Sequence, residues 1–240
     1  MQQITEEELL IKIVKYFEVN IFENHINASL TIHSRLKNYN INPIVVKYLS
    51  KVLENNYTPE GVAKALYYPR VLGTSINTSF GTNIQKMFIK LDLADGSAIK
   101  GIDIEFFDKI DGRKKWCQLK SGPNTINSED VNPLIAKFTN TIRLARTNDA
   151  LLGSNNNDFI VGVLYGEQLQ LSMHYKKIDE IYPVVIGREF WHRITGFPNF
   201  YDGLVVALHE IINHLDTKEF ITKGCEELAE DVRKSILFNF

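Results

Sequence analysis

The sequence has few of the residues that build disulfide scaffolds, membrane spans or nucleotide-binding loops. It contains only two cysteines, Cys117 and Cys225, and their spacing matches no metal site. No apolar run approaches the ~18 residues of a membrane span, and the acidic start MQQITEEELL is not a signal peptide. Neither a Walker or dinucleotide glycine loop nor a Gly-x-Ser-x-Gly motif occurs. We therefore expect a cytoplasmic protein, with no membrane association, that does not use ATP, NAD or SAM.

The sequence also lacks an excess of charge of either sign. It contains 27 Lys and Arg residues and 29 Asp and Glu residues, so its formal net charge is -2. Hydrophobic residues make up 44% of the chain. Such totals are typical of soluble globular proteins and exclude a histone-like binder, but they allow a local basic cleft for nucleic acid. We predict a single domain over residues 1–240, with a helical N-terminal part at 1–68, an α/β core at 69–215 and a C-terminal helix at 216–240.

Helix signals dominate the first third of the chain. Thr5 and Glu8 have the spacing of a capping box. Asn42-Pro43 and Thr58-Pro59 each combine an N-cap residue with a proline at the first helical position, and Pro69 is expected to end the second of these helices. Further helices are predicted to start at residues 79–82, at Asn132-Pro133 and at Phe200, with breaks near Asp216 and Gly224.

Strand signals begin after residue 100, where the hydrophobic period changes from 3.6 to 2. Residues 101–109 and 114–120 are predicted to form two strands, joined by a two-residue hairpin turn at Asp111-Gly112. The run 159–165 is almost entirely apolar, which is typical of a central strand buried on both faces. Residues 182–186 are a further candidate strand. These elements predict a mixed central sheet flanked by helices, an α+β (α/β) fold with a helical N-terminal part.

The predicted hairpin gathers polar side chains on one face. Its register places Asp103 opposite Lys120 and Glu105 opposite Gln118, and alternate residues on a strand share a face. Two carboxylates, an amide oxygen and an ammonium then form a plausible site for Mg²⁺, which prefers oxygen ligands and keeps several waters. Phosphodiester hydrolysis needs a metal, an in-line water and stabilisation of the leaving oxygen. A hairpin face with ordinary cross-strand charge pairs would give the same pattern, so the motif alone is weakly specific.

Asp103 and the run Gln118-Leu119-Lys120 resemble the PD-(D/E)xK nuclease motif in its Q-x-K form. The run that follows, 121–127, is similar to type II restriction endonucleases. The likeness spans about residues 69–215 in chain order. Further stretches resemble the group of these enzymes that reads GG/CC-type palindromes, namely 69–73, 79–85, 160–166 and 187–191.

This resemblance implies a restriction-endonuclease-like fold, a homodimer, cleavage of double-stranded DNA with Mg²⁺, and a cognate DNA methyltransferase that protects host DNA. By the same resemblance, Asp103 is the metal-binding aspartate and Lys120 the catalytic lysine. Gln118 occupies the position usually held by a second acid and supplies one neutral oxygen instead of a charge. Glu105 on the same face, or Gln85 on the preceding helix through a water, could compensate. If neither does, the chain could be a catalytically inactive relative.

The loop after Lys120 is the first candidate for DNA contacts, because it must lie near the scissile phosphate. Its amides and hydroxyls suit phosphate or base contacts, although a polar turn before a helix has the same composition. Lys137 and Arg143 on the next helix could follow the DNA backbone or form a solvated helix face. The candidate DNA-binding residues are therefore Ser121, Asn124, Thr125, Asn127, Lys137 and Arg143.

Three other functions remain open at this stage. A repair or recombination nuclease of the same fold would recognise DNA structure rather than sequence. A non-catalytic DNA-binding module would bind DNA without cutting it, which the amide at Gln118 makes conceivable. A structural or signalling protein with an accidental motif would show no salt-dependent affinity for DNA.

Overall fold

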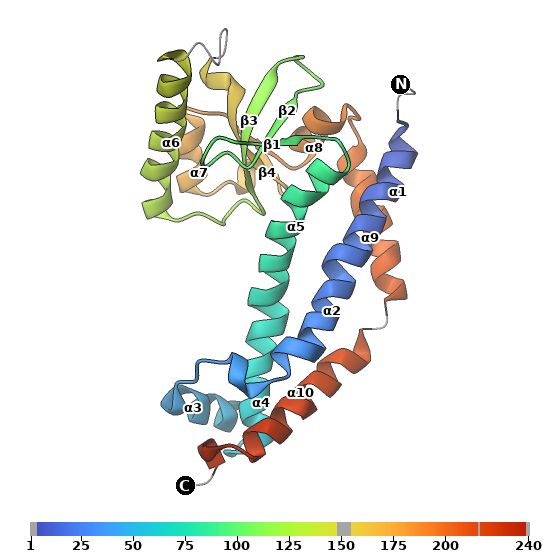
Figure 1. Ribbon diagram of the computed structural model, residues 1–240, viewed down its shortest axis with the longest axis vertical. Helices are drawn as coiled ribbons and strands as arrows, with labels where there is room; N and C mark the ends of the chain where they lie inside the picture. The colour runs from blue at the N-terminus through green and yellow to red at the C-terminus, as the bar shows by residue number, and fades with distance from the viewer. Residues whose placement is uncertain (1–3, 148–154, 216, 239–240) are drawn as a thin grey trace. The chain divides into compact units, whose positions relative to one another are not determined.

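The computed structural model describes residues 4–147, 155–215 and 217–238 (Figure 1). Its internal contacts divide the chain into two compact units, Met1–Val14 with Gly81–His209, and Lys15–Phe80 with Glu210–Phe240. We call the first the sheet unit and the second the helical unit. The organisation of residues 1–240 as one domain remains a prediction.

The sheet unit is built around a five-stranded mixed sheet in the order β1-β2-β3-β4-β5. The pairs β1–β2 and β2–β3 are antiparallel, whereas β3–β4 and β4–β5 are parallel. The predicted α+β class and mixed sheet are therefore confirmed. The strands are β1 (Asp95–Gly96), β2 (Ile104–Phe107), β3 (Lys114–Lys120), β4 (Phe159–Val163) and β5 (Val184–Ile186).

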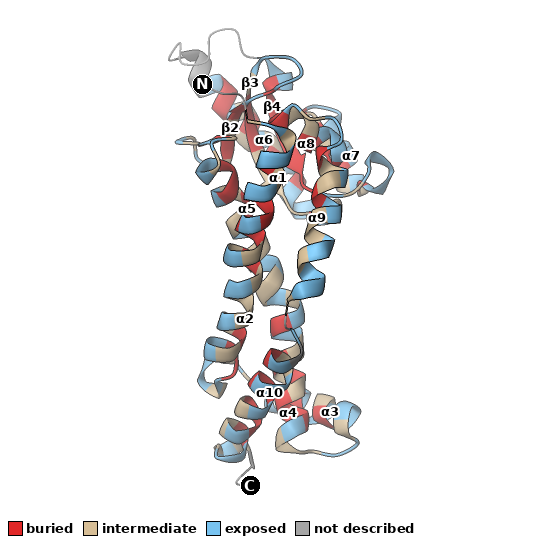
Figure 2. Ribbon diagram, turned by 90° about the vertical axis from the view of Figure 1, so that its right-hand side faces the viewer, coloured by how far each residue is buried: buried red, intermediate tan, exposed pale blue. Residues whose placement is uncertain are grey.

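Helices cover both faces of this sheet. On one face, α6 (Ser128–Thr147) and α7 (Met173–Asp179) pack through Phe138 and Tyr175 against Trp116 and alternate residues of β4. On the other face, Phe190 of α8 (Arg188–Thr195) packs on Phe106 and on Phe88 of α5 (Ile76–Lys90). All five residues of β4 are buried, as predicted for a central strand, and Figure 2 shows buried residues gathered in the strands.

The β2–β3 connection differs from the predicted hairpin. The Asp108 N–H donates to the Arg113 carbonyl at 2.9 Å, so four residues rather than two connect the strands. Glu105 therefore lies opposite Trp116, and the predicted pairing of Glu105 with Gln118 is wrong by two residues. The buried Asp108 carboxylate explains the longer loop, because it accepts from the Ile110 N–H at 2.8 Å and from Arg193 at 2.7 Å. A shift of two residues keeps the side chains of the paired residues 104–107 and 114–117 on their predicted faces.

An ionic cluster anchors the first half of β3. Asp158, whose side chain is 1% exposed, forms ion pairs with Arg113 and with Lys115 at 3.2 Å. Burial by itself would raise the pKa of Asp158, but hydrogen bonds from Arg113, the Asn155 N–H and Lys115 lower it to about 2. The cluster fixes the start of β3 beside the start of β4, upstream of Gln118 and Lys120.

The helical unit confirms two predicted helix starts. The Asn42 side chain accepts from two backbone N–H groups of α3 (Pro43–Glu54), and the Thr58 hydroxyl accepts from the Gly61 N–H at the start of α4 (Pro59–Pro69). The unit also holds α2 (Asn24–Ala28), α10 (Lys218–Arg233), the π-helical turns η1 (Glu18–Glu23), η2 (Ser29–His33) and η4 (Arg70–Ser75), and the short 3₁₀ turns η3 (Leu36–Asn38) and η7 (Ile236–Phe238). The helices α1 (Glu6–Phe17) and α9 (Phe200–His214) have residues in both units, and Thr5 and Glu8 form the predicted capping box of α1.

One predicted helix end holds in part and one is wrong. The α-helix α4 ends at Pro69 as predicted, but the chain stays helical, because the π-helical turn η4 follows directly and leads into α5. A proline removes one helical hydrogen bond and crowds the preceding turn, and the wider π-helical turn accommodates this without a break. Gly224 lies inside α10, where a Cβ would approach the Tyr67 hydroxyl to 2.0 Å, so the glycine serves close packing.

Candidate functional site

The candidate site lies at the C-terminal half of β3 and at Asp103, which precedes β2. Asp103 lies just before β2, and its N–H donates to the Cys117 carbonyl at 2.9 Å. Its carboxylate Oδ2 accepts from the Leu119 N–H at 2.7 Å. Burial raises the pKa of Asp103, and the Leu119 N–H, Lys120 and Lys137 act in the opposite direction. The structure thus brings one partly buried carboxylate together with two ammonium groups.

Gln118 has a buried polar atom without a partner. Its side-chain Oε1 is one of few buried polar atoms in the described part of the chain that accept no hydrogen bond. An unsatisfied buried carbonyl oxygen costs free energy, so it normally has a partner. A hard cation is a suitable partner, because Mg²⁺ prefers oxygen ligands and needs only a few from the protein. The donor set of Asp103 and Gln118 therefore fits a magnesium site.

Lys120 is the last residue of β3 and is half-buried beside Asp103. None of the ion pairs among the described residues includes Lys120 or Lys137. Lys120 also lines a cleft of about 260 Å³ in the sheet unit. The other residues of this cleft are Gly81, Ile84, Leu119, Ser121, Thr125 and Leu164.

Glu105 is already engaged. One carboxylate oxygen accepts from the Ser97 hydroxyl at 2.6 Å, and the other pairs with Lys114 at 2.6 Å. To reach a metal at Asp103, Glu105 would have to give up these partners. Its assignment as a metal ligand remains a prediction, with both oxygens occupied in the structure.

Gln85 contacts the backbone rather than the carboxylate of Asp103. Its Nε2 donates to the Asp103 carbonyl at 2.8 Å. The predicted contact through a water remains a prediction, but the structure gives Gln85 a direct role in positioning Asp103 from α5.

Two residues of the loop after Lys120 are used by the loop itself. The Thr125 hydroxyl donates to the Gly122 carbonyl at 3.0 Å and pairs with the Tyr175 hydroxyl at 2.8 Å. The Asn127 amide oxygen accepts from the N–H groups at the start of α6, so the helix begins at Ser128 rather than at the predicted Asn132-Pro133. Ser121 and the exposed Asn124 remain the loop side chains with no such role.

Lys137 and Arg143 lie in different environments on α6. Lys137 is half-buried and packs over Gly101, whereas Arg143 is exposed. Six residues of an α-helix turn the chain by roughly 600°, so the two side chains point about 120° apart. The expected role of both residues is contact with the DNA backbone, but only Lys137 acts on the Asp103 carboxylate in the structure.

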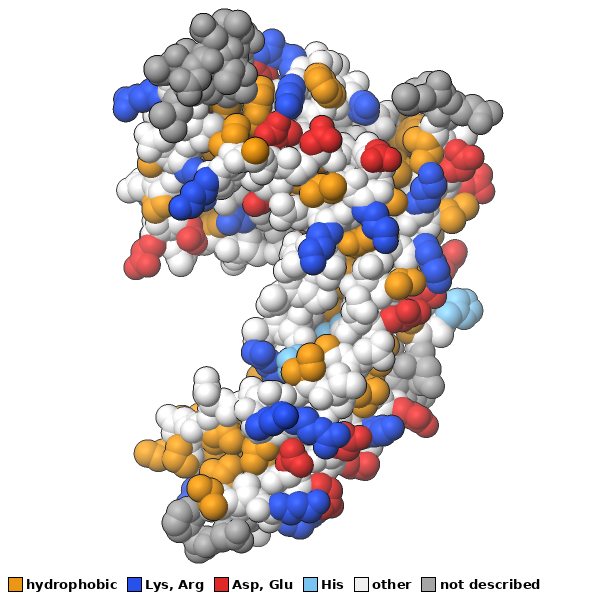
Figure 3. Space-filling model, viewed as in Figure 1, with side chains coloured by type: hydrophobic (Ala, Val, Ile, Leu, Met, Phe, Trp, Pro, Cys, Tyr) orange, Lys and Arg blue, Asp and Glu red, His pale blue; other side chains and the backbone are white. Residues whose placement is uncertain are grey.

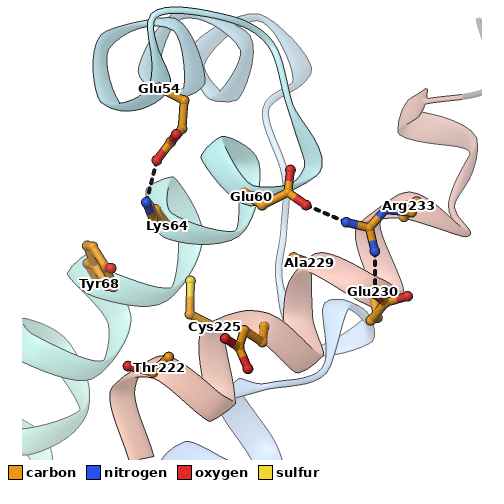
Figure 4. Close-up of a pocket in the computed structure, with 10 residues that line it drawn as sticks. Glu54, Glu60, Lys64, Tyr68, Thr222, Cys225, Ala229, Glu230 and Arg233 are labelled. Carbon is orange, nitrogen blue, oxygen red and sulfur yellow. Dashed lines mark hydrogen bonds and ion pairs between the residues drawn. The ribbon is translucent and has the colours of Figure 1, made fainter. Parts of the chain in front are cut away.

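The larger cavity of about 480 Å³ is separate from this site. It lies in the helical unit, and none of the predicted site residues lines it. Its rim is closed by ion pairs of Lys64 with Glu54, and of Arg233 with Glu60 and Glu230 (Figure 4). These pairs are satisfied within the cavity wall, so we place no catalytic chemistry there.

A cluster of conventional metal ligands is absent from the described residues. Within 4–147, 155–215 and 217–238, no three His, Cys, Asp or Glu side chains are grouped as a metal site would require. In the same ranges, no helix is both long and apolar enough to cross a membrane.

The comparison with known families decides the identity. A family model described as type II restriction endonuclease EcoO109I matches residues 13–216. The chain belongs to the EcoO109I family of type II restriction endonucleases. The resemblance to type II restriction endonucleases seen in the sequence is confirmed, and the match includes every predicted site residue. Membership in the EcoO109I family makes the chain a nuclease-type hydrolase that acts on DNA. No curated protein matches the chain.

Proposed function

We propose that this protein is an active, Mg²⁺-dependent type II restriction endonuclease of PD-(D/E)xK type. It cuts both strands of duplex DNA at a short palindromic site of the GG/CC type and leaves 5′-phosphate and 3′-hydroxyl ends. The observation that carries the proposal is the unpartnered Oε1 of Gln118, which shares a face of β3 with Lys120, a residue that acts to lower the pKa of the partly buried Asp103.

Asp103 and Gln118 would hold the metal. When bound, Mg²⁺ polarises a phosphoryl oxygen and stabilises the charge of the leaving oxygen. The Leu119 N–H and Gln85 fix the side chain and the carbonyl of Asp103, so the carboxylate is preorganised. Glu105 would join the ligand set only by leaving Lys114.

Lys120 would act on the water and the phosphate. As an ammonium at the end of β3, it has no competing ion pair and stands beside Asp103. It can donate to the attacking water, orient it in line with the leaving oxygen, and offset the charge that develops on the phosphate. Because Gln118 is neutral, the metal site has one charge fewer than a two-acid site, and we expect a higher magnesium requirement.

The loop after Lys120 and α6 would contact the DNA. Ser121 and Asn124, which have no other role in the loop, would contact phosphate or bases. Thr125 and Asn127 would do so only in addition to their roles in the loop. Arg143 on α6 would meet the DNA backbone.

A palindromic site suits a homodimer, because a twofold protein matches a twofold sequence. The helical unit exposes an apolar stripe on α3 formed by Ile44, Tyr48 and Val52, which are 80%, 67% and 61% exposed (Figure 3). Large exposed apolar patches often mark interaction sites, so this stripe supports pairing of two copies. A cognate methyltransferase would protect host DNA in the cytoplasm without forming a stable complex with the endonuclease.

The test is cleavage of unmethylated phage-length duplex DNA by the purified protein. Discrete fragments should form with Mg²⁺ and disappear with EDTA and with Lys120→Ala, and end-sequencing should give a palindromic site. Unbroken DNA with Mg²⁺, accompanied by a gel shift, would instead identify a binding protein without catalysis, the alternative that Gln118 favours. Cutting that follows DNA structure rather than sequence would identify a repair-type nuclease.

A further inference from the structure

Lys137 occupies a space that only a glycine leaves open. Gly101 has a φ of +92°, a conformation that favours glycine. A Cβ at this position would lie 2.0 Å from Cδ, 2.4 Å from Cε and 2.8 Å from Nζ of Lys137. The lysine stem thus passes directly over the Gly101 backbone, two residues before Asp103.

The ammonium of Lys137 lies close to the Gly101 backbone, and no ion pair among the described residues includes it. It acts on the Asp103 carboxylate together with Lys120, and both lower the pKa that burial raises. Lysines usually stay solvated and mobile, so ordering a half-buried one costs side-chain entropy. No acid among the described residues compensates that cost within 4 Å, as noted above for Lys137 and Lys120.

The charges at the site leave an excess of positive charge. Asp103 supplies one negative charge, Gln118 supplies none, and Glu105 is neutralised by Lys114. Lys120 and Lys137 supply two positive charges. Such a site is complementary to an anion, and in a DNA-cutting enzyme that anion is a backbone phosphate.

We propose that Lys137 is a second phosphate-binding cation of the catalytic site, held over Gly101 so that its ammonium contacts the DNA phosphate beside Asp103. This inference rests on the proposed nuclease activity and deepens it. It gives Lys137 a role in the catalytic site, whereas the exposed Arg143 would contact only the DNA backbone.

The experiment compares Lys137→Met with Lys137→Arg, and uses Lys177→Met on α7 as the matched control. Methionine keeps a flexible apolar stem over Gly101 and removes only the ammonium. Lys177 is an exposed lysine of the same unit. Once end-sequencing has given the site, single-turnover cleavage of a duplex carrying it is measured with Mg²⁺. We expect Lys137→Met to be slower by about 10- to 100-fold, Lys137→Arg to recover part of the rate, and Lys177→Met to match wild type.

A second measurement tests contact rather than activity. Binding of a short duplex is followed in EDTA over a range of salt concentrations. Loss of one phosphate contact should lower the slope of log affinity against log salt by about 1 for Lys137→Met. Lys177→Met should keep the wild-type slope.

The outcomes separate the two proposals. A wild-type protein that cuts, with a Lys137→Met variant equal to it in rate, overturns the role of Lys137 and leaves the nuclease intact. A slower variant with an unchanged salt slope also overturns the phosphate contact. If wild type cuts no DNA, the nuclease proposal fails, and the salt slope alone decides whether Lys137 binds phosphate.

Discussion

Replacing Gln118 by methionine should stabilise the metal-free protein and abolish cleavage. The substitution keeps the length of the side chain and removes the buried Oε1 that has no partner. Leaving a buried acceptor unsatisfied costs about 1–3 kcal/mol. At the lower end of that range, removal should stabilise the protein by about 1 kcal/mol. For a chain of this size, that corresponds to a rise of about 2–4 °C in the melting temperature in EDTA.

Added magnesium should reverse the order of the two proteins. A ligand at about ten times its dissociation constant stabilises the folded state by about 1.4 kcal/mol. Wild type should therefore gain stability with Mg²⁺, and Gln118→Met should gain little because it lacks one ligand. The assay is thermal unfolding of both proteins in EDTA and over a magnesium titration.

An exposed amide provides the control. Gln168→Met changes the same chemical group at an exposed position of the sheet unit, and it should alter stability by less than about 0.5 kcal/mol. If Gln118→Met melts at or below the wild-type temperature in EDTA, the unpartnered oxygen does not destabilise the metal-free protein. If wild type shows no response to Mg²⁺, the assignment of Gln118 as a ligand is refuted.

Three further substitutions test the ionic cluster at Asp158, the hydrogen bond from Gln85, and the packing of Gly224. Asp158→Asn should lower the free energy of unfolding by about 2 kcal/mol at pH 7, because the folded state lowers the carboxyl pKa to about 2. Denaturant midpoints should show this difference above about pH 4 and its loss as the pH falls towards 2. Gln85→Leu should slow cleavage about 10-fold without unfolding the protein, because the Asp103 carbonyl loses its donor; an unchanged single-turnover rate would remove Gln85 from the site. Gly224→Ala should destabilise by about 1–3 kcal/mol against the Tyr67 hydroxyl, and Tyr67→Phe should relieve part of that loss in a double-mutant cycle; additive losses would exclude the contact.

The face of the hairpin could be predicted from the sequence, but its register could not. Alternation alone puts Glu105 and Gln118 on one side, and any even shift preserves it. The loop length depends on Asp108, whose partner Arg193 is 85 residues away. A local turn signal contains no information about such a contact. For the same reason, Pro69 was a valid local stop signal that the following π-helical turn overrode.

Asp103, Gln118 and Lys120 could be proposed as site residues from the sequence because they lie close together in the chain or on neighbouring strands, and their roles remain predictions. The sequence could propose Lys137 only as a general DNA contact, because its place beside Asp103 depends on the backbone conformation at Gly101 and on the path of α6. Asn127 is a residue for which the sequence allows two roles. Its side chain suits DNA contacts and helix capping equally, and only the structure shows that it caps α6.

The position of β3 within the sheet has a consequence for the way activity is lost. Gln118 and Lys120 lie on the third of five strands, with hydrogen-bonded neighbours on both sides. Amide protons in such a strand exchange only when a large part of the sheet opens, whereas those of the loop that follows can exchange by local fraying. Heating should therefore first loosen the loop proposed to contact DNA, while β3 with the proposed ligand Gln118 stays protected. On these proposed roles, affinity for DNA should decline before the candidate metal site comes apart, and hydrogen exchange would resolve the two events.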